Sequence, residues 1–105
     1  MRLKTVLKNA RKLVAREGGW SQGRYRTRVN VNRRTINSYC LVGAIMQADC
    51  NNDPPRFFEA TEVMSQVIKN CRPMYNGCLT AWNDFSGRTQ QDVIRAFDRA
   101  IEAQG

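Results

Sequence analysis

Apolar positions near the start of the chain recur at the spacing of a helix. From Arg2 to Arg16 the apolar residues lie three or four positions apart, and lysines and arginines fall between them. This pattern predicts an amphipathic helix that packs its apolar face on a core. Gly18-Gly19 would end the helix, because glycine tolerates the left-handed conformation of a helix cap.

The next segment changes to the spacing of a strand. From Arg24 to Val31, arginines and asparagines alternate with tyrosine, threonine and valine, and a period of two is typical of a strand with one covered face. If residues 32–34 turn the chain, residues 35–37 return as a short partner strand. A lone hairpin is marginal in water, so we expect it to pack on the helices.

Residues 39–48 are apolar nearly all round, which predicts a central, buried helix. Ser38 stands where an N-cap is needed. Gly43 costs helix stability, so its presence inside the segment indicates close packing against a neighbour.

The second half of the chain continues in helical patterns. Asp53-Pro54 is an N-cap followed by proline at the first helical position, and this helix is expected to reach about residue 70. Residues 78–84 are long enough for a short helix, and Thr89 begins a capping box for a last helix over residues 90–103. We therefore predict one domain over residues 1–105, mainly α (α+β), with about four helices and one small β-hairpin after the first.

The positive charge is concentrated in the first third of the chain. Residues 1–34 hold eleven lysines or arginines and one acidic residue, a net charge of +10, and the remainder carries −2 of the total of +8. Such asymmetry indicates an anionic partner, although a basic solvated surface would produce the same count. Eight cations are the candidates for binding nucleic acid or a partner: Lys8, Arg11, Lys12, Arg24, Arg26, Arg28, Arg33 and Arg34.

Strand periodicity would place Arg24, Arg26 and Arg28 on one face, and a basic ribbon can enter a major groove. Tyr25 or Trp20 could stack on a base, although Tyr25 could equally anchor the hairpin to the core. No recognised nucleic-acid motif accompanies these residues, so this interpretation depends on charge.

The chain lacks the usual groups of an active site. It has no histidine, which removes the commonest general base and every pairing of histidine with a nucleophile. Its four cysteines, at 40, 50, 71 and 78, show no zinc knuckle, and its glycines match no phosphate-binding fingerprint. We therefore expect no enzyme activity, no catalytic residue, no metal and no cofactor.

The longest strongly apolar stretch, residues 39–46, is too short to span a bilayer, and no secretory signal is recognisable. These features predict a cytoplasmic protein that does not enter a membrane, with reduced thiols. The oligomeric state is left open.

Residues 82–89 combine structural and chemical signals. Trp82 is expected to bury its ring against the first and second helices, and Asn83 or Asp84 to bond to backbone amides of the following turn. Thr89 would cap the last helix. Arg88 has no evident local partner and could pair with Asp84 or reach a ligand. The segment is thus predicted to be a structural clasp, with a functional site as the alternative.

Four blocks stand in order along the chain: residues 19–23 (GWSQG), residues 39–45 (YCLVGAI), residues 82–89 (WNDFSGRT), and Val93 with residues 97–101 (FDRAI). Together they resemble an uncharacterised domain family of bacteria and their phages. The resemblance implies a small helical domain in a bacterium or a phage-infected host cell, and it carries no established activity or site residues. The arginine-rich hairpin departs from the more acidic, glycine-containing turn expected there.

Three functions are compatible with these features. The first is a small non-enzymatic protein that engages nucleic acid or a ribonucleoprotein through its arginine-rich first third. The second is a phage-encoded protein inhibitor of a host defence complex, such as an anti-CRISPR-type protein. The third, remote, is an enzyme built around Asp84 and Arg88, with zinc on the cysteines.

Overall fold

The computed structural model describes residues 2–49, 53–68 and 76–104 of the chain. Five helices and two strands follow one another there: α1 (Leu3–Ala15), β1 (Arg26–Val31), β2 (Arg34–Tyr39), α2 (Leu41–Ala48), α3 (Pro54–Val67), α4 (Asn76–Asp84) and α5 (Gln90–Glu102). The fold is mainly helical with one hairpin, as predicted, but the expected count of about four helices is too low. Residues 78–84 belong to a full nine-residue helix, α4.

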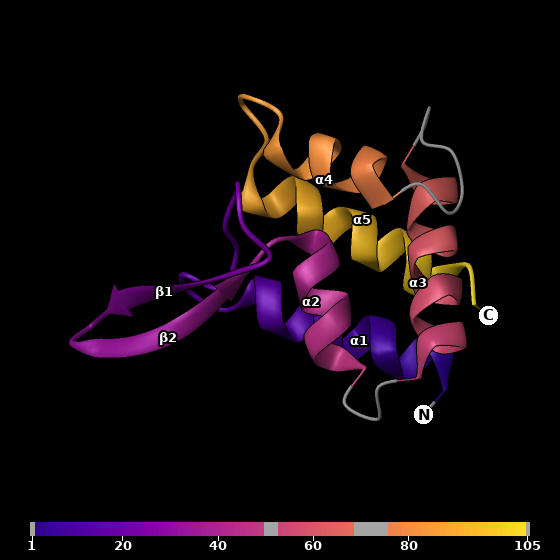
Figure 1. Cartoon of the computed structure of the whole chain (residues 1–105), viewed down its shortest axis with the longest axis horizontal. Coiled ribbons are helices and arrows are strands. Elements are labelled where there is room, and N and C mark those ends of the chain that lie inside the picture. The colour runs from indigo at the N-terminus through magenta and orange to yellow at the C-terminus, as the bar shows by residue number, and fades with distance from the viewer. Residues whose placement is uncertain (1, 50–52, 69–75, 105) are drawn as a thin grey trace.

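The helices pack into one body, and the hairpin extends from one end of it (Figure 1). Helix α1 packs against both α2 and α5, while α3 and α4 close the other sides. The amphipathic pattern of α1 and α5 explains this pairing, because each turns its apolar stripe toward the other. The largest fully buried side chains come from all five described helices, and include Leu7, Leu41, Ile45, Met64, Leu79 and Phe97.

A salt bridge joins α1 to α5 across this contact. Arg11 donates from Nε to Oδ1 of Asp98. Among the described residues, no salt bridge joins Asp98 to Arg95 or Arg99 of its own helix. The carboxylate serves the packing of two helices that are distant in sequence.

Strands β1 and β2 are antiparallel, with Val29 opposite Ile36 and Val31 opposite Arg34. The turn has only two residues, Asn32 and Arg33, both with positive φ (50° and 68°). Two such residues are typical of the type I′ turn, whose twist suits a tight hairpin. The predicted three-residue turn is therefore wrong, and β2 is longer than the expected residues 35–37 because it runs from Arg34 to Tyr39.

The apolar side of the hairpin covers the end of α1. A Cβ added to Gly18 would clash with Val31, and Val29 and Ile36 lie close by. Arg16 donates from Nη2 to the carbonyl of Asn37 at 2.8 Å. The apolar side of the hairpin is thus held against the segment that follows α1, as the marginal stability of isolated hairpins requires.

The junction between β2 and α2 differs from the prediction in one respect. Cys40, and not Ser38, is the N-cap of α2, and its sulfur accepts a hydrogen bond from the Gly43 amide at 3.3 Å. Ser38 is instead the penultimate residue of β2 and is fully buried. Gly43 has the predicted role, since any Cβ there would collide with the backbone of Tyr25.

The expectation of reduced thiols is wrong for Cys78, which is disulfide-bonded. Cys40 is a free, buried thiol whose pKa is raised by burial. The predictions for the cysteines at positions 50 and 71 fall outside the described residues.

None of the described helices is both long enough and apolar enough to cross a membrane.

Candidate functional site

The hairpin presents the five arginines that the sequence singled out. Arg24 precedes β1, Arg26 and Arg28 lie within it, and Arg33 and Arg34 form the tip. All five are exposed. No carboxylate of the described residues forms a salt bridge with any of them. We call these five residues the arginine hairpin.

The strand register divides the arginine hairpin between two faces. Arg26 and Arg28 alternate with Thr27 and Val29, so they occupy the exposed face, while Val29 turns toward Gly18. Arg34 is paired with Val31 and therefore shares the apolar side of the hairpin, directly after the turn. The exposed face and the tip together form one projecting cationic surface.

The three candidate cations of α1 have different surroundings. Lys8 and Lys12 are exposed on the helix. Arg11 is occupied by its salt bridge to Asp98 and is only partly exposed. The structure therefore leaves Lys8 and Lys12 available to a partner and gives Arg11 a packing role.

The structure also separates the two aromatic candidates for base stacking. Tyr25 is 51% exposed and stands between Arg24 and Arg26. It lines two hollows of about 240 Å³ each, one shared with Met46 and one with Thr80. Trp20 is half-buried, and its indole Nε1 donates to Oδ1 of Asn83 at 2.7 Å. Tyr25 is therefore accessible to a base, while Trp20 is part of the folded framework.

Asn83 is the centre of the predicted clasp. Its side chain is fully buried. Besides the bond from Trp20, Oδ1 accepts from the Leu41 amide at 3.0 Å, and Nδ2 donates to the Ser21 carbonyl at 3.1 Å. One amide group thus joins α4, the start of α2 and residues 20–23, here called the tryptophan loop.

Asp84 extends the same connection. Its Oδ1 accepts from the Gly23 amide and from Asn83 Nδ2, both at 2.9 Å. Gln22 completes it by donating to the carbonyls of Asn83 and Phe85 at 3.0 and 3.1 Å. Asn83 and Asp84 were expected to bond to the turn that follows them, and this is wrong: they bond to a loop about sixty residues earlier.

The other residues of the segment 82–89 have separate roles. Thr89 caps α5 as predicted, with Asp92 completing a capping box. Arg88 pairs with neither Asp84 nor another carboxylate of the described residues; its Nε donates to the Trp82 carbonyl at 2.9 Å. Trp82 is partly buried against the core, and it also lines a pocket with residues of α3 and α5.

The capping box has an electrostatic consequence. Hydrogen bonding from the Thr89 amide lowers the pKa of the Asp92 carboxyl, and Arg88 and Arg95 add to the effect.

Among the described residues, no group of three or more histidine, cysteine or acidic side chains could hold a metal ion.

Comparison with known proteins gives one match. The model of a protein family described as a family of unknown function (DUF6197) matches residues 1–103. This agrees with the uncharacterised domain family that the sequence resembles. No curated protein and no solved structure matches the chain.

Proposed function

The chain belongs to this family of unknown function, and we propose that it is a non-enzymatic protein that binds nucleic acid, free or within a ribonucleoprotein, through its arginine hairpin. The observation that carries the proposal is a hairpin that extends from the helical body (Figure 1) and carries four exposed arginines, with a fifth, Arg24, exposed just before β1. Arginine forks match the geometry of phosphate oxygens, and phosphate contacts supply most of the affinity of such complexes.

Tyr25 supports the same proposal. An exposed aromatic ring between two arginines and beside two hollows fits the arrangement in which bases stack on a side chain while cations hold the backbone. Lys8 and Lys12 on α1 would add phosphate contacts on the helical body.

The test is the binding of fluorescently labelled 5′-hydroxyl DNA and RNA at two salt concentrations. The parent protein should bind at low salt and weaken steeply as salt rises. The double variant Arg26→Gln/Arg28→Gln should bind more weakly, with a salt slope smaller by about 0.7–0.9 for each arginine removed. Both positions are exposed, so the unfolding midpoint should not change.

The matched control is Arg95→Gln/Arg99→Gln, which removes the same charge from α5. It should leave binding to internal, 5′-hydroxyl nucleic acid unchanged. Absence of binding by the parent at low salt would overturn the proposal. Recovery of a stoichiometric protein partner from nuclease-treated lysate would overturn it in favour of a protein-binding module.

A further inference from the structure

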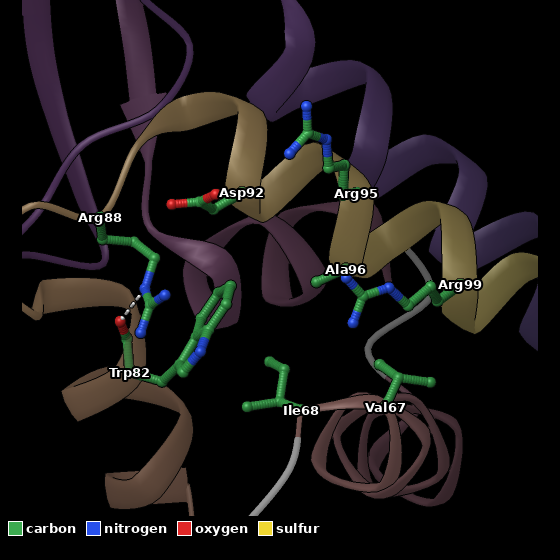
Figure 2. Close-up of a pocket in the computed structure, with 8 residues that line it drawn as sticks. All are labelled: Val67, Ile68, Trp82, Arg88, Asp92, Arg95, Ala96 and Arg99. Carbon is green, nitrogen blue, oxygen red and sulfur yellow. Dashed lines mark hydrogen bonds between the residues drawn. The ribbon is translucent and has the colours of Figure 1, made fainter.

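A pocket of about 280 Å³ lies among the ends of α3, α4 and α5, on residues that the proposed function does not use. Figure 2 shows its walls: Ile68 after α3, Trp82 from α4, and Arg88, Asp92, Arg95 and Arg99 along or just before α5. Its size is close to the lower end of the range for small-ligand pockets, roughly 300–1,000 Å³.

One wall of the pocket is an aromatic ring held in place. The Arg88 guanidinium carbon lies 4.0 Å from the centroid of the Trp82 ring and 5.5 Å from that of Phe85. Arg88 also donates to the Trp82 carbonyl, so the ring is fixed from one side. The other side of the ring faces the space in front of Ile68 and Arg99 (Figure 2).

The pocket carries an excess of positive charge. Three guanidinium groups line it, with one carboxylate, that of Asp92. Asp92 is already engaged, because its Oδ2 accepts from the Thr89 amide at 3.0 Å in the capping box. No salt bridge joins Arg88, Arg95 or Arg99 to any carboxylate of the described part of the chain.

Of the two arginines within α5 that line the pocket, Arg99 is the one that faces the ring of Trp82 (Figure 2). Arg95 and Arg99 are four residues apart on α5 and therefore share a helix face. In Figure 2 Arg99 extends toward the space beside Trp82, whereas the guanidinium of Arg95, one turn earlier on α5, points away from that space. A net charge of two positive units beside a flat ring matches a phosphate monoester, which carries about −1.5 to −2 at neutral pH, better than a single carboxylate.

We propose that this pocket binds a nucleoside 5′-phosphate, with the phosphate on Arg99 and the base against the open face of Trp82, and with Arg95 turning from its position in Figure 2 to add a second phosphate contact. The ligand is either a free nucleotide or the 5′-phosphorylated end of a nucleic acid, because both present the same group. The site consists of residues from α3, α4 and α5 only, so it does not depend on the function proposed for the hairpin.

The experiment is calorimetric titration of the full chain carrying Arg26→Gln/Arg28→Gln, which weakens hairpin binding and leaves the pocket intact. The probes are adenosine 5′-monophosphate, adenosine, inorganic phosphate, and one tetranucleotide with and without a 5′-phosphate. Binding of the monophosphate identifies a free nucleotide, and binding of the phosphorylated tetranucleotide alone identifies a nucleic-acid end. Adenosine and inorganic phosphate should each bind at least about tenfold more weakly than the phosphorylated probe that binds.

Adding Arg95→Gln/Arg99→Gln should weaken binding of the phosphorylated probe by about tenfold or more, because hydrogen bonds to charged groups are lost. Arg2→Gln/Lys4→Gln at the start of α1 is the matched control, because it removes two positive charges outside both proposed sites, and it should have no effect. The proposal is overturned if no phosphorylated probe binds, if adenosine or inorganic phosphate binds equally well, or if the double arginine variant binds as its parent does. Unchanged unfolding midpoints keep the result separate from any folding defect.

Discussion

The indole nitrogen of Trp20 donates to the side-chain oxygen of Asn83 at 2.7 Å, across 63 positions of sequence. The same oxygen also accepts from the amide of Leu41. Because Asn83 is fully buried, no solvent can replace its amide. The hydrogen bonds of this one side chain hold the tryptophan loop, α2 and α4 in a single arrangement.

Replacing Asn83 with alanine should therefore destabilise the protein strongly. The variant leaves the donors of Trp20 and Leu41 without their acceptor, and each unsatisfied buried group costs about 1–3 kcal/mol. We expect the free energy of unfolding to fall by about 2–5 kcal/mol, measured by urea denaturation. Gln66→Ala, an exposed change on α3, is the control. A midpoint for Asn83→Ala equal to that of the control would contradict the structural role of the clasp.

Asp84 offers a test of whether the clasp is instead a functional site. Asparagine at this position keeps an oxygen that can accept from the Gly23 amide, so Asp84→Asn should cost at most about 1 kcal/mol, whereas Asp84→Ala should cost more. Nucleic-acid binding measured by anisotropy should not change in Asp84→Asn. If this variant melts like the parent and loses all binding, residues 82–89 form the functional site.

The hairpin turn allows charge and stability to be separated. Arg33 has a φ of 68°. This left-handed conformation costs a residue with a Cβ roughly 1–2 kcal/mol. Glycine avoids this steric cost, although it loses more backbone entropy on folding. Arg33→Gly should raise the free energy of unfolding by about 0.5–1 kcal/mol and still weaken nucleic-acid binding. Arg34→Gly, at a strand position, removes the same charge and should lower stability. Equal stability changes in the two variants would be inconsistent with the turn described here.

Gly43 should not tolerate a methyl group. Alanine normally favours a helix over glycine by about 1 kcal/mol, but the added Cβ would collide with the Tyr25 backbone. We expect Gly43→Ala to lower the free energy of unfolding by about 1–3 kcal/mol, as overpacking does. The exposed change Gln47→Ala in the same helix should be close to neutral. A gain in the melting temperature of Gly43→Ala would show that Tyr25 does not approach α2 as closely as described.

The capping box predicts a pH dependence. The pKa of Asp92 is lower in the folded chain than its ordinary value of 3.8, chiefly because the Thr89 amide donates to the carboxylate. A carboxyl whose pKa is lower in the folded state stabilises the fold at pH values above its ordinary pKa. This contribution to stability is lost as the pH falls through the lower pKa of the folded state. Asp92→Asn should therefore be less stable than the parent at neutral pH, and the difference should shrink as the pH falls below the ordinary pKa of 3.8. Urea midpoints at several pH values measure it, and a constant difference would refute the assignment.

Much of the secondary structure is determined by the sequence itself. The helical spacing of α1 and α5, the alternation of β1 and the Thr89 capping box all depend on residues within one or two turns of each other, so they can be recognised locally. The role of Gly43 can also be recognised locally, because a glycine inside an apolar helix indicates that another segment packs closely against it. The sequence could not say which backbone that neighbour would be.

Tertiary structure decided where the polar side chains go. Asn83 and Asp84 have the residue types of a local turn, and they bond to a loop about sixty positions away. Asp98 pairs with α1 instead of with its own helix. A polar side chain carries no periodic signal of its partner, because any donor brought near by packing can satisfy it.

The same holds for the two candidate surfaces. Charge count predicted a basic first third, but only the strand register and the salt bridge of Arg11 show which of its cations are presented together and which are occupied. The pocket beside Trp82 had no sequence signal beyond Arg88. It exists because α3, α4 and α5 converge there, and convergence is a property of packing, which the spacing of residues along the chain does not encode.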